Sequence, residues 1–101
     1  MAVNCVARER ILTVRLSGEV DHHAAKQIME TLDSRIDREL PRSLRIDMSG
    51  VTFMDSSGIA VLLRAYRRMA AMEGSMQVMG VPRQAARVLR TAGLHRIIQF
   101  T

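Results

Sequence analysis

A chain of 101 residues has room for one domain with one core and is too short for two. Its composition, 48% hydrophobic and 25% charged, is that of an ordinary globular protein and excludes intrinsic disorder. The formal net charge of +5 raises the question of nucleic acid, but aromatic residues make up only 3% of the chain and no recognition-helix motif is present, so we expect no nucleic-acid binding.

The first 41 residues predict a β-hairpin and a helix. Val3–Arg8 and Ile11–Ser17 read as strands joined by a two-residue turn, the second with clear alternation. Asp21 is placed to cap a helix, and Pro41 ends it because proline cannot continue a helix. The apolar stripe of this helix has the periodicity of packing on one side, and its members are Ala25, Ile28, Leu32, Ile36 and Leu40.

The middle of the chain predicts a strand, a loop and the most apolar helix. Ser43–Met48 reads as a short strand and Ser49–Met54 as a loop. The helix starts near Ser56 and runs to about Met72, with Gly74 available as its C-cap, and we expect it against the centre of the sheet. Its expected buried face consists of Ile59, Leu62, Leu63, Tyr66, Met69 and Ala70.

The last part of the chain predicts a strand, a helix and a final short strand. These are Ser75–Met79, a helix with Pro82 in its first turn and Gly93 at its end, and Ile97–Phe100. Strands joined through helices run parallel, so the order predicts an α/β domain in which an initial antiparallel hairpin is followed by βαβ units. The inward residues of this third helix are expected to be Ala85, Val88, Leu89 and Ala92.

Arginines recur at helical spacing on two of the predicted helices. The two sets are Arg64, Arg67 and Arg68, and Arg83, Arg87 and Arg90. A solvated face is the simplest interpretation of each set. As binding surfaces they suit an acidic protein better than nucleic acid.

The single cysteine, Cys5, cannot form an internal disulfide. The first ten residues contain no signal-peptide pattern, and no apolar run approaches the roughly 20 residues of a membrane helix. We therefore expect a cytoplasmic protein with no membrane association.

The residue types of a hydrolase occur without the spacing that would make them a site. His22, His23 and His95 together with Ser56 and Ser57 have the side chains of a triad, but no glycine before a serine builds a nucleophile elbow. Catalysis is therefore not expected.

Metal and nucleotide binding lack a motif as well. Glu19, Asp21, His22 and His23 carry metal-ligand side chains, yet no second ligand group follows at a recognisable spacing. A helix cap followed by surface histidines explains them, and no glycine-rich loop would cradle a phosphate. We expect no metal or other cofactor, and a binding module instead of an enzyme.

The run Asp55, Ser56, Ser57 and Gly58 precedes the apolar helix that begins at Ile59. A lone Asp or Ser there is ordinarily an N-cap, but a cap does not require two serines with a glycine directly behind. A hydroxyl in the first turn lies where backbone N–H groups point outward and the helix dipole favours negative charge. A phosphate added there would be tolerated by the fold.

Three segments resemble the anti-sigma factor antagonists of bacteria, whose fold is called the STAS domain. They are LSGEVDHHAA at Leu16–Ala25, VTFMDSSGIAVLLRAY at Val51–Tyr66 and TAGLHRIIQF at Thr91–Phe100, and they span nearly the whole chain in consistent order. The resemblance implies a single STAS domain over residues 1–101, with a mixed β-sheet and helices packed mainly on one face.

The resemblance also implies a function. In that family the second serine of the Asp-Ser-Ser-Gly motif is phosphorylated by an anti-sigma factor that is itself a serine/threonine kinase, and this position is Ser57. The unphosphorylated chain is then expected to bind the kinase and free a sigma factor for transcription, and a serine phosphatase to reset it. By resemblance the partner-binding residues are Asp21, His22, Asp55, Ser56, Gly58 and Ile59.

Two points of the resemblance stay open at this level. A sensing or scaffolding STAS domain without a kinase is the alternative function, and the intact phosphoacceptor argues against it. Many members continue past the last strand into a further helix on the sheet, so we expect some apolar surface near Ile97–Phe100.

Overall fold

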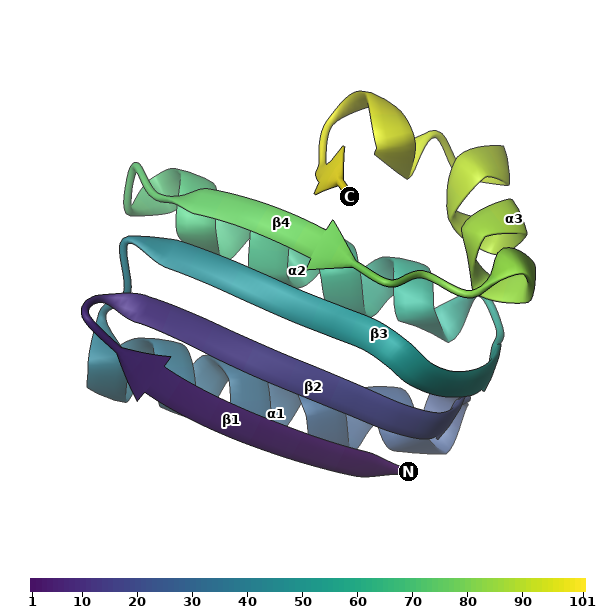
Figure 1. The fold of residues 1–101 in the computed structure, drawn as a ribbon, viewed down its shortest axis with the longest axis horizontal. Helices are drawn as coiled ribbons and strands as arrows, with labels where there is room; N and C mark the ends of the chain where they lie inside the picture. The colour runs from purple at the N-terminus through teal and green to yellow at the C-terminus, as the bar shows by residue number, and fades with distance from the viewer.

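Five strands pair in the order β1-β2-β3-β4-β5 in the computed structural model, which describes residues 1–101. β1 (Ala2–Arg8) and β2 (Ile11–Val20) are antiparallel. β3 (Ser43–Met54), β4 (Ser75–Met79) and β5 (Gln99–Phe100) then follow as parallel neighbours (Figure 1). The predicted mixed sheet, with its antiparallel hairpin and βαβ units, is confirmed.

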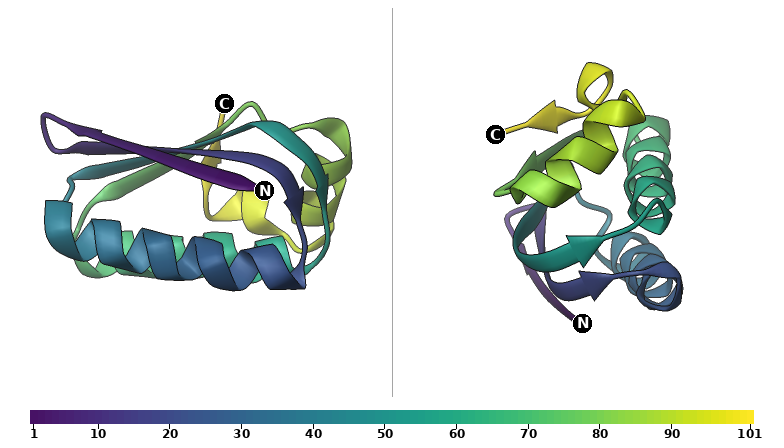
Figure 2. Two further views of the ribbon diagram at one scale, coloured as in Figure 1. Left: turned by 90° about the horizontal axis from the view of Figure 1, so that it is seen from below. Right: turned by 90° about the vertical axis from the view of Figure 1, so that its right-hand side faces the viewer.

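Two long helices cover one face of this sheet. α1 (His22–Glu39) and α2 (Ser57–Ala71) lie side by side beneath the strands in Figure 2, and α2 contacts β3 and β4. α3 (Arg83–Thr91) and the short 3-10 helix η1 (Leu94–Arg96) connect β4 to β5, and α3 packs near the end of β3. No helix combines the length and the hydrophobicity needed to cross a membrane.

The core lies between the sheet and the two long helices. Its 24 buried hydrophobic residues form one cluster, and no polar or charged side chain is buried with them. Alternate residues of β2 as far as Leu16 and of β3 as far as Met48 point into it, as the predicted period of two requires. The largest side chains of the core include Leu12, Leu16, Ile28, Ile36, Leu44, Ile46, Met54, Leu62 and Met69.

The hairpin turn ties the sheet to the far end of α1. Glu9 and Arg10 have φ angles of 52° and 65°, the pair of positive values of a type I′ turn, whose twist matches that of the flanking strands. The Arg10 guanidinium donates to the carbonyl of Leu40 at 2.8 and 3.0 Å. This charged hydrogen bond fastens the turn to the residue where α1 ends.

The predicted loop over Ser49–Met54 is wrong, because β3 continues through it to Met54. β3 pairs with β2 as far as Met54 opposite Val20, so β2 is also longer than predicted. Two register shifts give β3 one extra residue each, and buried residues accordingly fall at Met48, Val51 and Met54. These bulges break the alternation, and the sequence pattern therefore looked like a loop.

Two predicted core positions lie at helix ends and are exposed. Leu40 is 55% exposed, because the chain turns there into a left-handed conformation (φ 44°). Ala92 is the exposed C-cap of α3, followed by Gly93 at φ 79°, which ends the helix as predicted. At the end of α2 the left-handed residue is Glu73 and not the predicted Gly74. Gly74 instead permits a close approach, since a Cβ there would lie 2.8 Å from the carbonyl oxygen of Arg42.

The buried face of α2 is rotated relative to the prediction. Because α2 packs against α1 as well as against the sheet, small residues join its buried side. Buried are Gly58, Val61, Leu62, Ala65 and Met69, whereas Ile59, Leu63 and Tyr66 are half-buried and Ala70 is exposed. Near the last strand Ile97 is 47% exposed, whereas Ile98 is buried and Phe100 is half-buried, so the expected apolar surface is limited to Ile97.

Candidate functional site

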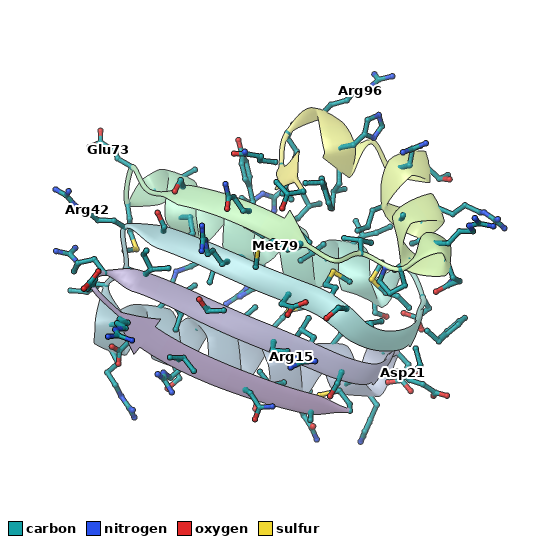
Figure 3. The ribbon with its side chains drawn as sticks, viewed as in Figure 1. Arg15, Asp21, Arg42, Glu73, Met79 and Arg96 are labelled. Atoms are coloured by element: carbon teal, nitrogen blue, oxygen red, sulfur yellow. The ribbon has the colours of Figure 1, made fainter.

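The ends of β2 and β3 bring the two predicted acidic residues to one edge. Val20 and Met54 are partners in the parallel register, so Asp21 and Asp55 leave the sheet from adjacent positions. The Asp55 N–H also donates to the carbonyl of Val20 at 3.2 Å. Asp21 is labelled at this edge in Figure 3, and the first turns of α1 and α2 follow directly from it.

Asp21 caps α1 as predicted. Its Oδ1 accepts a hydrogen bond from the N–H of Ala24 at 2.8 Å, which satisfies a first-turn donor. His22, the first residue of the helix, is exposed. Both candidate partner-binding residues of this loop therefore present polar groups at the edge, with the carboxylate held in place.

Asp55 holds the start of α2. Its Oδ1 accepts from the N–H of Ser57 at 2.8 Å, and its carbonyl accepts from the N–H of Gly58 at 3.1 Å. Ser56 is the exposed N-cap residue but has helical backbone angles (φ −63°, ψ −15°) and makes no capping bond with its side chain. The carboxylate before the two serines thus performs the capping.

Ser57 is the first residue of α2 and is half-buried. Its N–H is engaged by Asp55, whereas its hydroxyl has no hydrogen-bond partner within the protein. The backbone of Ser57 is therefore held in place by Asp55, whereas its hydroxyl oxygen is free to accept or donate a hydrogen bond. A phosphoryl group on this oxygen would lie at the positive end of the helix dipole.

Gly58 is buried, and packing explains why a glycine follows the serines. A Cβ at this position would lie 2.3 Å from Sδ and 2.5 Å from Cγ of Met54, whose side chain is in the core. Any larger residue would push Met54 away from the helix. Gly58 therefore supports the site from beneath and offers little surface of its own.

Gln84 of α3 is a residue of this site that the sequence did not reveal. Its side-chain amide accepts from the N–H of Met54 at 2.9 Å and donates to the carbonyl of Met54 at 2.8 Å. This pair of bonds holds the last residue of β3, directly before Asp55. The only signal in the sequence is a polar residue in the first turn of a helix, which is too common to single it out.

A shallow groove joins the start of α2 to α3. Its walls are mostly apolar, and we call it the α2–α3 groove. Its lining residues are Ser56, Ile59, Arg87, Val88, Thr91 and Ala92. Two predicted partner-binding residues, Ser56 and Ile59, thus line this shallow, open groove.

The residues considered for catalysis and metal binding do not assemble. His22 and His23 lie in α1 and His95 in η1, and no hydrogen bond joins any of them to Ser56 or Ser57. Nor do three His, Cys, Asp or Glu side chains come together in an arrangement that could hold a metal ion.

The groups with altered pKa lie outside this edge. Hydrogen bonds from Arg64, followed by its charge, hold the pKa of Asp33 below the ordinary value. The pKa of Asp47 is lowered by the hydrogen bond from the N–H of Ser49, whereas burial raises the pKa of the Cys5 thiol. None of these groups belongs to the candidate site.

Comparison with known proteins gives one consistent result. The family model of the STAS domain matches residues 2–101. Over 88 residues the chain is 35% identical to an anti-sigma F factor antagonist of Paenibacillus polymyxa, covering 87% of this chain and 75% of the relative. An anti-sigma F factor antagonist of Lysinibacillus sphaericus is 32% identical over 89 residues, covering 88% and 75%.

Solved structures of similar fold include proteins with the same description as these relatives. The anti-sigma factor antagonist SpoIIAA in its unphosphorylated form superposes with a TM-score of 0.86 at 26% identity, covering 99% of this chain and 88% of SpoIIAA. The Bacillus SpoIIAA in the phosphorylated form gives 0.78 at 25% identity, covering 99% and 91%. The chain therefore belongs to the STAS domain family, and it is similar in sequence and in fold to anti-sigma factor antagonists.

Proposed function

We propose that this protein is an anti-sigma factor antagonist whose binding is switched by phosphorylation of Ser57. The observation that supports this most is the state of the Ser57 side chain, whose backbone N–H is held by Asp55 while its hydroxyl is unbonded at a helix N-terminus. The relatives carry the name anti-sigma factor antagonist, and one of them, SpoIIAA, is known in a phosphorylated form. The protein then acts by binding and performs no catalysis itself.

The proposed partner is an anti-sigma factor that is also a serine/threonine kinase. The unphosphorylated protein binds it in the cytoplasm and thereby frees a sigma factor, and a serine phosphatase restores that state. The proposed contact surface is the edge formed by Asp21, His22, Asp55, Ser56 and Ile59, with Gly58 supporting it from below. Its polar groups come from two adjacent loops, so a single partner surface can reach all of them.

Phosphorylation acts on this surface directly in our proposal. A phosphoryl group on Ser57 adds about −1.5 to −2 charges beside Asp55. The helix N-terminus stabilises that charge within the domain, so the fold is retained. In a closed interface the same group adds bulk, must lose its bound water, and repels any negatively charged groups of the partner. A loss of about 3 kcal/mol of binding free energy weakens binding more than a hundredfold.

The test is phosphorylation of the purified protein by candidate anti-sigma factor kinases with ATP, followed by location of the phosphate by mass spectrometry. We expect one phosphate on Ser57 and none after Ser57→Ala, whereas the matched variant Ser56→Ala is modified like the natural protein. Full phosphorylation of Ser57→Ala would contradict the assignment. No phosphorylation by any such kinase would favour a sensing or scaffolding STAS domain instead.

The direct mechanism has a separate test. Ser57→Asp should weaken kinase binding, whereas Ser57→Ala should bind persistently. In Ser57→Asp the thermal midpoint and the backbone amide spectrum should stay nearly unchanged outside Asp55–Ile59. Amide shifts or hydrogen-exchange changes spread through the sheet and the far helices would show an allosteric mechanism in place of a direct one.

A further inference from the structure

The arginines of α2 and those of α3 differ in whether they have charged partners within the domain. Arg64 donates to Asp33 at 2.7 Å, and Arg68 donates to Asp33 at 3.1 Å and also to Asp37. Both carboxylates belong to α1, so these charged pairs join the two long helices. Arg64 and Arg68 thereby have partners within the domain, whereas the third arginine of α2, Arg67, is exposed and forms no salt bridge.

The arginines of α3 have no charged partner within the domain. Arg83, Arg87 and Arg90 are exposed and form no salt bridge, and residues 74–101 contain no aspartate or glutamate. Their spacing of four and three residues places them on one helix face, where they line a shallow surface depression together with Ala86 and Thr91. We call this set of three arginines the α3 arginine face.

This arrangement is unfavourable for the isolated domain. Like charges at this spacing repel each other, and a cation at the start of a helix opposes the dipole. Arg83 is the first residue of α3, and no acidic residue lies in the first turn to offset it. An external group with negative charge would relieve both effects.

The α3 arginine face is continuous with the proposed Ser57 surface. Arg87 and Thr91 line the depression on α3 and also the α2–α3 groove, whose other wall is formed by Ser56 and Ile59. A partner that covers the start of α2 therefore reaches Arg87 without leaving the groove. The groove supplies apolar contact, and the arginines supply charge.

From this geometry we propose that the α3 arginine face binds a carboxylate-rich segment of the same protein partner that covers Ser57. The inference rests on the proposed function and names the chemistry of the partner. A protein fits better than nucleic acid, because the adjoining groove is mostly apolar and holds no aromatic side chain on which a base could stack. Charge pairs at such a rim set the association rate and its dependence on salt.

The inference also names the charged groups of the partner that a phosphoryl group on Ser57 would repel, which are carboxylates. A carboxylate-rich segment on α3 would lie across the groove from Ser56, the neighbour of Ser57, so a phosphoryl group on Ser57 would meet like charge across the interface. The α3 arginine face would then attract the partner to the same surface on which modification of Ser57 acts.

The experiment compares two variants with the same change in charge. One is Arg83→Gln/Arg87→Gln/Arg90→Gln. The control is Arg8→Gln/Arg38→Gln/Arg42→Gln, whose arginines are exposed, unpaired and near the hairpin turn, at the end of the sheet opposite to Asp21, where Figure 3 labels Arg42. Thermal midpoints of both variants verify folding before any binding is measured.

The first probe is a decaglutamate peptide, titrated at about 25 mM salt, where charges are weakly screened, into isotopically labelled protein. We expect amide shifts at α3 and at residues 56–59, about tenfold weaker binding by the α3 variant, and little change in the control. Equal weakening in both variants, or shifts spread evenly over the surface, would overturn the inference. So would sub-micromolar binding of single-stranded or duplex DNA at about 150 mM salt, since non-specific DNA binding is far weaker there.

The second probe is an anti-sigma factor kinase that phosphorylates the natural protein at Ser57. Binding by the α3 variant should be about tenfold weaker and should depend less steeply on salt than binding by the control. If the kinase modifies Ser57 but binds both variants equally, the inference fails while the proposed function stands. If no kinase modifies Ser57, the proposed function fails, and the peptide titration still decides the inference.

Discussion

The contact between Gly58 and Met54 predicts that even one added methyl group disturbs the start of α2 at the Asp-Ser-Ser-Gly motif. In Gly58→Ala the new Cβ would lie 2.3 Å from Sδ and 2.5 Å from Cγ of Met54, well inside van der Waals contact. The Met54 backbone cannot move away, because Gln84 holds its N–H and its carbonyl. The side chain must therefore change rotamer inside a closed core, where it is only 1% exposed.

The magnitude follows from two opposing effects. Overpacking of a core costs about 1–3 kcal/mol. Alanine is favoured over glycine in a helix by about 0.5–1 kcal/mol, which offsets part of that cost. We expect Gly58→Ala to lower the free energy of unfolding by about 1–2 kcal/mol in urea titrations, although the substitution would stabilise an isolated helix.

A double-mutant cycle separates this contact from other effects. Met54→Ala removes the atoms that the new methyl group meets, so Gly58→Ala should cost about 1–3 kcal/mol less in the Met54→Ala background. Gly93→Ala is the control, because it has a strained φ of 79° but no atom within 4 Å of the added Cβ, and it should not couple to Met54. Additivity of Gly58→Ala and Met54→Ala within about 0.5 kcal/mol would refute the packing account.

Three more predictions follow from the described contacts. Gln84→Leu removes both hydrogen bonds to the part-buried Met54 backbone and should lower the free energy of unfolding by about 1–3 kcal/mol, measured in urea; an unchanged value would show that water replaces the amide. Because the folded-state pKa of Asp33 is lowered by Arg64, its contribution to stability is present above the unfolded pKa of about 3.9 and is lost as pH falls below it. Asp33→Asn should therefore narrow the difference in unfolding free energy between about pH 6 and pH 3, and an unchanged difference would contradict the pairing. Burial raises the pKa of Cys5, so its reaction with a thiol reagent at about pH 8 should be slower than that of the unfolded chain, and equal rates would show an exposed thiol.

Local patterns in the sequence predicted the elements that rest on local chemistry. The alternation in β2, the capping carboxylate of Asp21 and the helix end at Gly93 each depend on a few neighbouring residues. The start of α2 at the Asp-Ser-Ser-Gly run was predicted to within one residue for the same reason. The partner-binding roles of the residues around it remain predictions.

Features that depend on distant residues could not be predicted in this way. The second half of β3 exists because β2 pairs with it through two register shifts, and neither is visible in the sequence of β3 alone. Gln84 acts on Met54 across 30 positions of the chain. The two arginine sets look alike in the sequence, and only the packing of α1 against α2 shows that Asp33 occupies one of them.

The dielectric surroundings of the edge differ between the free domain and a complex. This difference explains how one phosphoryl group on Ser57 could leave the fold stable and still weaken the binding of a partner. Two unit charges 4 Å apart interact by about 1 kcal/mol in bulk water and by about 4 kcal/mol near a protein surface with an effective dielectric constant of about 20. We assign the smaller size to the repulsion between Asp55 and a phosphoryl group on Ser57 in the free domain, where water surrounds the edge. The first turn of α2, which contains no acidic residue, would offset this repulsion by about 0.3–1 kcal/mol. In our proposal the partner displaces this water, so the repulsion between the phosphoryl group and the partner's carboxylates would take the larger value. The stabilisation of the phosphoryl group by the helix N-terminus would grow far less. The difference of about 3 kcal/mol amounts to more than a hundredfold in affinity, and it arises only in the complex.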